Sequence, residues 1–197
     1  DRTAFYPEGG GQPADHGTLG TTAVTDVHER DGVIFHTCDS PVETGSIVEG
    51  AIDWPRRFDH MQQHSGEHIL SGLLCSLYDC DNVGFHLGAD TVTIDYNREL
   101  TWEQVLAAEL RANEAIWADT PAEITFPSPE TLEHLHYRSK KELTGQVRIV
   151  SFPGADCCAC CGTHVRRAGE VGLIKILSCQ KFREGVRLEI LCGARAY

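Results

Sequence analysis

Two short motifs, about 90 residues apart, carry side chains that together could bind one metal ion. His64 and His68 lie four residues apart, and Cys160 and His164 repeat that spacing. In a helix, residues four apart lie one turn apart on the same face, so both imidazoles of the first motif can reach a single ion. The cysteine and histidine of the second motif would complete a tetrahedral shell of nitrogen and sulfur ligands.

The ligand types favour zinc over the other common metals. A thiolate combined with imidazoles suits zinc, whereas magnesium and calcium prefer carboxylate and carbonyl oxygens. Cys160 is the preferred sulfur ligand because its spacing to His164 mirrors the histidine pair, and Gly162 gives the intervening turn conformational freedom. Three nearby thiols are alternatives: Cys157, Cys158 and Cys161.

The role of such a zinc ion is open at this level. Four protein ligands make a closed structural site, whereas catalytic zinc usually keeps one position free. A metalloprotease is disfavoured because Glu67 follows His64 by three positions, not by the one position that the H-E-x-x-H motif needs. Four neighbouring residues are candidates for proton transfer or for orienting the ligands, although each alone is more typical of a structural side chain: His60, Gln63, Glu67 and His86.

Composition points to a soluble, cytoplasmic protein. The chain has 197 residues, without an apolar run long enough to span a membrane and without a signal peptide. Its nine cysteines are odd in number and four of them crowd into residues 157–161, which fits a metal in a reducing compartment better than disulfides. Because Asp1 opens a stretch typical of a domain interior, we expect further residues to precede it in the natural protein.

Charge limits the kind of nucleic acid contact. A formal net charge of −12 disfavours a broad basic surface that coats nucleic acid, because phosphate contacts need Lys and Arg. Local contact is compatible with short basic clusters, each more typical of a solvated face: Arg56-Arg57, Arg138 with Lys140-Lys141, Arg166-Arg167, and Lys181 with Arg183.

The metal motifs need a scaffold, and the sequence predicts an α+β protein of two domains. Residues 1–54 alternate short β-rich runs with turn residues and predict a small antiparallel β-barrel-like domain, with strands at 22–28, 32–36 and 47–52. Residues 6–13 are rich in Gly and Pro, which suits a sharp turn or a close approach to a ligand, and equally a plain connecting turn.

Residues 55–197 predict a zinc-binding α+β domain with an antiparallel sheet. Asp59 is the expected N-cap of a helix over 61–77 that carries His64 and His68. A capping box at Thr101 and Gln104 opens a second helix to Trp117, and Ser128-Pro129 opens a shorter one. Strands are expected at 91–96 and, in one sheet, at 146–152, 170–177 and 186–192, with the Cys/His segment in a loop between two of them.

Three segments of the chain resemble a known family. They are FYPEGGGQP at 5–13, DHMQQHSGEHILS at 59–71, and CCGTHV at 160–165 followed by GEVGLIK at 169–175. In this order and spread over nearly the whole chain, they resemble the freestanding alanyl-tRNA editing proteins of the AlaX type, which are homologous to the editing domain of alanyl-tRNA synthetase. One departure is Cys161, where the synthetase pattern has a glycine.

The resemblance implies both an activity and its residues. Members of the family remove serine, and some remove glycine, from mischarged tRNA for alanine by hydrolysing the ester. The zinc ligands of the family correspond to His64, His68, Cys160 and His164. A Gly-rich segment that rejects the correct alanyl ester corresponds to Gly9, Gly10, Gly11 and Gln12. Thr3 is the expected contact of the serine hydroxyl.

We therefore expect a zinc-dependent aminoacyl-tRNA deacylase that acts in trans and grips the acceptor end of tRNA, with neither DNA nor a membrane as partner. An aminoacyl ester is already activated, so a positioned water and oxyanion stabilisation suffice. A site built to bind a hydroxyl discriminates against alanine, because its polar groups stay unpaired without that hydroxyl. The alternatives are a non-catalytic RNA-binding module with a structural zinc and, more remotely, a hydrolase of small esters.

Overall fold

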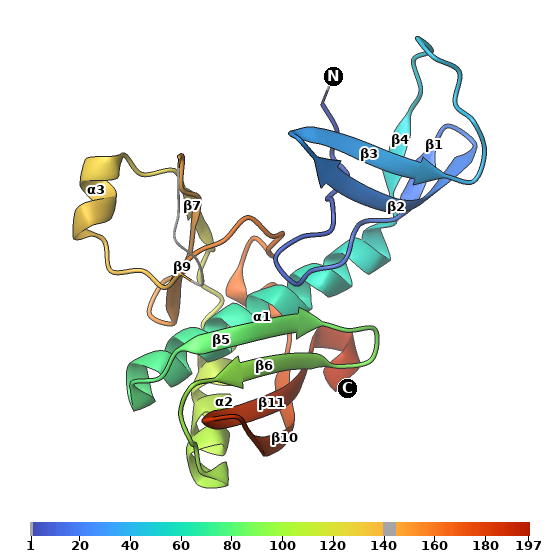
Figure 1. Cartoon of the computed structure of the whole chain (residues 1–197). Coiled ribbons are helices and arrows are strands. Elements are labelled where there is room, and N and C mark those ends of the chain that lie inside the picture. Colours follow the sequence, from blue (N-terminus) through green and yellow to red (C-terminus); the bar gives the residue numbers. More distant parts are fainter. Residues whose placement is uncertain (1, 140–144) are drawn as a thin grey trace. The chain divides into compact units, whose positions relative to one another are not determined.

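The chain folds into two compact units, which are described separately. The structure is a computed structural model that describes residues 2–139 and 145–197 (Figure 1). The first unit is Asp1–His60 and the second is Met61–Tyr197, so the division falls within the first helix, α1. Both units combine helix with antiparallel strands, which confirms the predicted α+β class.

The first unit contains one open antiparallel sheet of four strands in the order β3-β2-β1-β4. The strands are β1 Gly17–Leu19, β2 Thr22–Arg30, β3 Val33–Cys38 and β4 Gly50–Ile52. Phe5, Ala14, Val24 and Val27 form its buried core. The predicted barrel-like closure is wrong, because β3 and β4 lie at opposite edges of the sheet and do not pair with each other.

The Gly-rich segment of this unit is a tight two-residue turn. Gly9 and Gln12 exchange both backbone hydrogen bonds at 3.1 Å. The two residues between them, Gly10 and Gly11, have φ of 62° and 87°. Positive φ at both central positions is typical of a type I′ turn, a conformation that is unfavourable for residues with a Cβ. The local backbone therefore explains why two glycines stand here.

Helix α1, Trp54–Tyr78, begins earlier than its sequence pattern suggests. The Asp53 side chain accepts a hydrogen bond from the Arg56 backbone N–H at 3.2 Å, and Pro55 occupies the first turn, where its missing N–H costs nothing. The predicted N-cap at Asp59 is wrong, because Asp59 lies inside the helix. Trp54 and Phe58 already have the i, i+4 apolar spacing of a helix in these first turns, and their rings stack at 6.1 Å.

The larger sheet of the second unit has the order β10-β11-β6-β5 and is antiparallel throughout (Figure 1). Its strands are β5 Asn82–Leu87, β6 Val92–Tyr96, β10 Ile174–Phe182 and β11 Gly185–Cys192. Helix α2, Trp102–Trp117, opens with the predicted capping box of Thr101 and Gln104. Its buried face is formed by Val105, Ala108, Ala112, Asn113 and Ile116.

A separate small sheet of the second unit carries the strand before the metal motif. It has the order β7-β8-β9, with β7 Glu123–Thr125, β8 Ile149–Phe152 and β9 Asp156–Ala159. The short helix α3, Pro129–His134, is capped by Ser128 as predicted. The expectation that 146–152 shares a sheet with the last two strands is wrong, because β8 pairs with β7 and β9 instead.

Close packing holds the second half of α1 against the strands around it. Gln63 binds the backbone of Cys192, donating to its carbonyl at 2.7 Å and accepting from its N–H at 2.8 Å. At Gly66 a Cβ would meet the Cys192 Sγ at 2.3 Å, and at Gly72 one would meet the Ala155 carbonyl oxygen at 2.3 Å. The half of α1 that bears both metal-motif histidines is therefore held by contacts with Cys192 of β11 and, at Gly72, with Ala155 and Asp156 at the start of β9.

Candidate metal centre

The structure brings all four predicted ligands of the metal motifs together within the second unit. His64 and His68 come from α1, whereas Cys160 and His164 come from the loop that follows β9. The Cys160 Sγ lies 3.5 Å from His64 Nε2 and 3.4 Å from His164 Nε2. One ligand atom from each of the four residues fits within a mutual spacing of 4.8 Å.

These spacings fit a zinc ion. Zinc bonds of about 2.0–2.1 Å to nitrogen and about 2.3 Å to sulfur, set at the tetrahedral angle, place the nitrogen and sulfur ligands about 3.6 Å apart. The two sulfur–nitrogen distances of 3.5 and 3.4 Å are close to that edge length. The three histidines are buried, with exposed fractions of 2–6%. The site is thus a pre-arranged N₃S shell of the size that zinc needs.

The alternation of β9 separates the rival thiols. Cys158 is buried and belongs to a neighbouring group with His68 and Asp156, whose ligand atoms also lie within 4.8 Å of one another. Cys157, on the opposite side of the strand, lines a hollow elsewhere in the unit, and Cys161 is exposed. Among the described residues, Cys160 is the thiol grouped with the three histidines.

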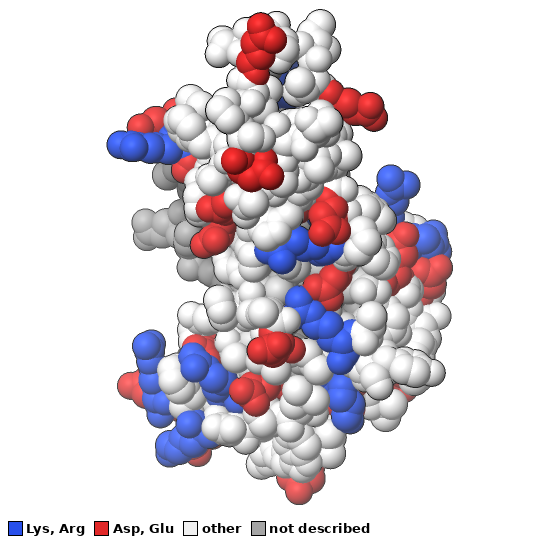
Figure 2. Space-filling model, turned by 90° about the vertical axis from the view of Figure 1, so that its right-hand side faces the viewer, with Lys and Arg blue, Asp and Glu red and all other residues white. Residues whose placement is uncertain are grey.

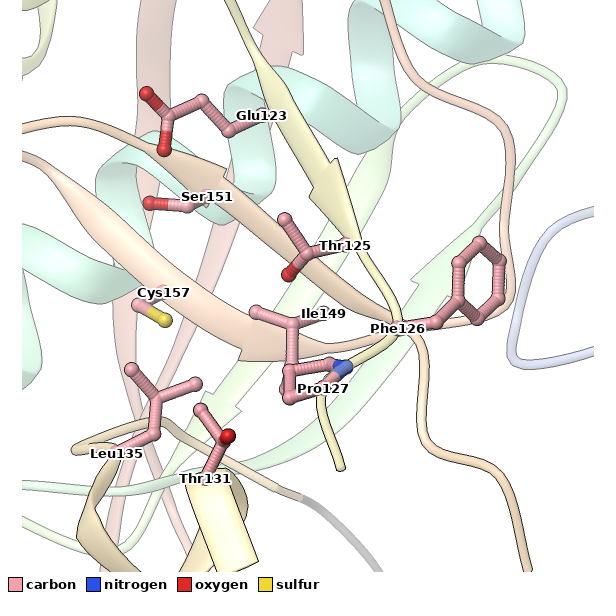
Figure 3. Close-up of a pocket in the computed structure, with 9 residues that line it drawn as sticks. All are labelled: Glu123, Thr125, Phe126, Pro127, Thr131, Leu135, Ile149, Ser151 and Cys157. Carbon is pink, nitrogen blue, oxygen red and sulfur yellow. The ribbon is translucent and has the colours of Figure 1, made fainter. Parts of the chain in front are cut away.

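The hollow beside Cys157 is a different feature from the histidine cluster. It lies between the small sheet and α3 and has a volume of about 390 Å³ (Figure 3). Its lining is mostly uncharged and includes Thr125, Phe126, Ile149, Ser151 and Leu135. Figure 3 shows the Cys157 sulfur directed toward Leu135 and Thr131 of the α3 region. This placement removes Cys157 from the set of candidate ligands.

The electrostatics of the cluster favour the protonation states that a metal requires at two of the four ligands, Cys160 and His164. Burial alone raises the pKa of the Cys160 thiol, but hydrogen bonds from His164, His64 and His68 lower it far more, which makes Cys160 a thiolate. Burial, reinforced by the positive charges of His68 and His64, lowers the pKa of His164 to about 3. A thiolate and a neutral imidazole are therefore ready for metal binding.

Two ligand histidines have a close polar neighbour at Nδ1. The His68 Nδ1 lies 3.0 Å from the Asp156 Oδ2. The His164 Nδ1 lies 3.1 Å from the Ser65 Oγ, which also accepts the Val165 backbone N–H at 3.1 Å. Burial lowers the pKa of His68, but Asp156 and Cys160 outweigh it and raise that pKa to about 9.

Neither Asp156 nor Ser65 was singled out from the sequence. Ser65 lies inside the HSGEH motif, where it is read as a spacer between two histidines. Asp156 lies four residues before Cys160 and shares the inward face of β9 with Cys158. Asp156 could have been found from the sequence if residues 156–159 had been recognised as a strand, because alternate residues of a strand share one face.

Two of the other polar candidates, Gln63 and Glu67, make hydrogen bonds that hold the fold together. Gln63 is occupied by the Cys192 backbone. Glu67 is fully buried, and its carboxylate accepts hydrogen bonds from Ser71 at 2.8 Å and from Asn82. Its other oxygen lies 4.0 Å from the His68 Nε2. His86 is exposed on β5, and His60 is buried in the first unit.

The predicted substrate-contact residues lie in the first unit. The Thr3 Oγ1 is 2.9 Å from the His36 Nε2 and accepts the Phe5 backbone N–H at 3.2 Å. Gly9, Gly10, Gly11 and Gln12 form the type I′ turn described above. Gln12 is fully buried. The local contacts of these residues are structural, and their contact with substrate stays a prediction.

On the face that Figure 2 shows, basic side chains are interspersed with Asp and Glu. Individual cations pair with neighbours, for example Arg167 with Asp119 at 2.8 Å and Lys181 with Glu99 at 2.6 Å. Lys140 and Lys141, part of one predicted basic cluster, lie outside the described residues.

In the described part of the chain, none of the helices has the length and apolar character needed to cross a membrane.

Family models match both ends of the chain. Residues 147–188, which contain Cys160 and His164, match the threonyl and alanyl tRNA synthetase second additional domain. Residues 1–56 match the class II (A) tRNA synthetases. The metal-motif loop and the strands that flank it therefore occur in a domain shared with two kinds of aminoacyl-tRNA synthetase.

Full-length relatives support the same assignment. The chain is 39% identical, over all of its length and 51% of the relative, to alanyl-tRNA editing protein AlaX-L of Pyrococcus horikoshii. It is 37% identical to alanyl-tRNA editing protein Aarsd1-B of Xenopus laevis, over 98% of the chain and 48% of the relative. An alanine–tRNA ligase of Ignicoccus hospitalis is 36% identical over 99% of the chain and 23% of the ligase. The chain thus spans about half the length of the editing proteins it matches, and over its whole length it is homologous to the alanyl-tRNA editing proteins.

Proposed function

We propose that this chain is a zinc-dependent deacylase that hydrolyses the ester of mischarged aminoacyl-tRNA. Its substrate is tRNA for alanine that carries serine, and a second proposed substrate is the same tRNA carrying glycine. The protein acts in trans, on tRNA that a synthetase has released. The observation that carries the proposal is the N₃S cluster of His64, His68, Cys160 and His164, located in a chain homologous to editing proteins.

The residues of the cluster suit this chemistry. Zinc, when bound, supplies Lewis-acid polarisation and orientation of a substrate that already carries an activated ester. Cys160 enters as a thiolate and His164 as a neutral imidazole, so neither has to lose a proton before binding. Burial of the three histidines excludes bulk water and strengthens every electrostatic interaction at the site.

Selectivity for serine is assigned to the first unit. Thr3 would contact the serine hydroxyl, and Gly9, Gly10, Gly11 and Gln12 would reject the alanyl ester. The physical support is that a type I′ turn exposes backbone at its two glycines, where a close approach by a ligand meets no side chain. A missing hydroxyl then leaves polar groups unpaired, which discriminates by a large factor.

The expected partner is the acceptor end of the tRNA, and neither DNA nor a membrane. With a net charge of −12 and basic residues interspersed with acidic ones, a short contact with the reacting end fits better than an extended grip on phosphates. The acidic composition and the free thiols are compatible with cytoplasmic translation, where such proofreading takes place.

The direct test is to incubate the zinc-loaded protein with seryl-tRNA and with alanyl-tRNA for alanine and to follow loss of the ester. We expect rapid loss of the seryl ester, sparing of the alanyl ester, and loss of activity after chelation of the metal. Thr3→Val, which removes one hydroxyl at similar size, should reduce the preference for serine while zinc content is unchanged.

The alternative is a non-catalytic RNA-binding module, favoured by one observation: four protein ligands close a tetrahedral site. The same experiment separates the two functions. A protein that holds one equivalent of zinc, binds tRNA and hydrolyses neither ester would establish the module and reject the deacylase.

A further inference from the structure

We propose that Asp156, locked by Arg138, is the positioning residue that orients His68 for metal binding through Nε2. The inference rests on the proposed metal binding and deepens it, because it names the groups that hold one ligand in place. Asp156 is not a ligand in the N₃S cluster and is not part of the HSGEH or CCGTH motif.

The first observation is the contact between the carboxylate and the ring. The Asp156 Oδ2 lies 3.0 Å from the His68 Nδ1, a close ion-pair contact whose angle does not meet the geometry of a hydrogen bond. The side chains of both residues are only 1% and 3% exposed, so water does not compete for this contact. The negative charge of a carboxylate beside Nδ1 favours a proton on that nitrogen and so leaves the lone pair of Nε2 for the metal.

The second observation is that the carboxylate itself cannot turn away. Arg138 donates from Nε to the Asp156 Oδ1 at 2.7 Å and from Nη2 to the Oδ2 at 2.9 Å, a bidentate pair. The Arg138 backbone is also anchored to β9, because its N–H binds the Cys157 carbonyl at 2.8 Å and its carbonyl accepts the Ala159 N–H at 2.9 Å. Arg138 therefore fixes the Asp156 carboxylate in its position beside His68.

Packing fixes the distance between the strand and the helix. Gly72 lies one turn after His68 on α1, and a Cβ at this position would meet the Asp156 Cβ at 2.6 Å and its Oδ1 at 2.6 Å. The absence of a side chain at Gly72 is what allows β9 to approach α1 closely enough for the contact with His68. A carboxylate buried this deeply needs such partners, since an uncompensated charge in the interior is strongly unfavourable.

The two oriented histidines differ in the charge of their partners. His164 faces the neutral hydroxyl of Ser65, whereas His68 faces a carboxylate. A carboxylate acceptor makes the imidazole a stronger ligand, and removal of such a partner typically weakens metal binding by about 10–100-fold. The proposal therefore predicts that His68 depends on its partner more than His164 does.

The test is to measure zinc affinity by chelator competition in the wild type, in Asp156→Asn and in Ser65→Ala. We expect zinc binding in Asp156→Asn to be about 10–100-fold weaker, with a smaller loss in Ser65→Ala. The matched control is Asp95→Asn, which breaks an equivalent bidentate pair with Arg187 at 2.6 and 2.8 Å and should leave zinc affinity unchanged. Unchanged affinity in Asp156→Asn, with tight zinc binding by the wild type, overturns the proposal.

Two further measurements separate positioning from a general effect on folding. In a His68→Ala background, Asp156→Asn should cause no additional loss of zinc affinity, whereas an equal loss in both backgrounds would make Asp156 merely structural. In zinc-loaded wild type, nitrogen NMR should show His68 protonated at Nδ1. Zinc at Nδ1 would overturn the inference even if Asp156→Asn does not fold, and a wild type that binds no zinc would reject both this inference and the metal-dependent function.

Discussion

At the scale of single residues, the site depends on which thiol meets the three histidines. Cys160 lies at hydrogen-bonding distance from His64 and His164, whereas Cys161 next to it is exposed. Adjacent cysteines thus have different roles, since only one of the two side chains points into the cluster. The cluster lowers the pKa of Cys160, while burial raises that of Cys158 to about 12. Only Cys160 combines thiolate character with the right location.

Removal of Cys160 should therefore abolish metal binding and activity together. We expect Cys160→Ala and His64→Ala each to lose bound zinc and to lose deacylation of seryl-tRNA, measured by metal analysis and ester hydrolysis. Cys161→Ala is the matched control, because it removes a neighbouring thiol at the surface and should retain both. Turnover by a zinc-free Cys160→Ala protein would contradict a role for the metal in catalysis.

At the scale of elements, α1 determines the geometry of the site by its fit against β11. The Gln63 side chain takes the place of a strand partner for the Cys192 backbone, where β11 ends. Three residues along the helix, Gly66 allows the Cys192 side chain to approach. Gln63 and Gly66 lie on either side of His64 in the sequence. A small shift of the helix would therefore move both of the metal ligands that it carries, His64 and His68.

Gly66→Ala should destabilise the protein despite the higher helix propensity of alanine. Propensity alone favours alanine by about 0.8–1 kcal/mol, but a Cβ that would lie 2.3 Å from the Cys192 Sγ demands movement in a packed core, which costs about 1–3 kcal/mol. We expect a net fall in the free energy of unfolding, measured in urea, and weaker zinc binding. Gly50→Ala, whose Cβ would meet its neighbours at an ordinary 3.4 Å, is the control.

Gln63→Ala should cost more than Gln62→Ala. The first change removes two buried hydrogen bonds, to the N–H and to the C=O of the Cys192 backbone, at about 1–3 kcal/mol for each group. The second removes one partly buried hydrogen bond, from Gln62 to the Glu170 carbonyl at 2.8 Å. Equal losses in urea unfolding would show that the Gln63 bonds do not hold α1 against β11.

At the scale of the whole chain, acidity limits how the protein can bind RNA. The net charge is −12, and several cations are already paired with carboxylates. Binding through a few phosphates near the reacting end would then rely on local residues such as Arg166, which is exposed and lies two positions after His164. Affinity for tRNA should accordingly depend only moderately on salt.

We expect the plot of log affinity for tRNA against log salt concentration to have a slope of about −2 to −3, corresponding to about three or four phosphate contacts. Arg166→Gln should make the slope less steep by about 0.7, whereas Arg30→Gln, an equal change of charge on an exposed residue of the first unit, should leave it unchanged. A slope steeper than about −6 would indicate an extended phosphate grip and contradict the prediction.

The sequence by itself determined the parts of this protein that depend on local spacing. His64 and His68 share a helix face because of their i, i+4 spacing, and the capping box of Thr101 and Gln104 opens α2 as predicted. The three matching segments also indicated the family before any fold was known. These features could be read directly because each is a pattern of residues close together in the sequence.

Only the tertiary structure decided the features that depend on distant pairing. It divided the strands of the second unit between two sheets, left the sheet of the first unit open, and put Asp156 next to His68, although the two are 88 positions apart in the sequence. Strand β9 was missed because its sequence, DCCA, reads as a cluster of thiols, and its identity as a strand comes from its hydrogen bonds to β8. Local propensity cannot specify such partners, since sheet pairing and burial are properties of residues brought together from separate parts of the chain.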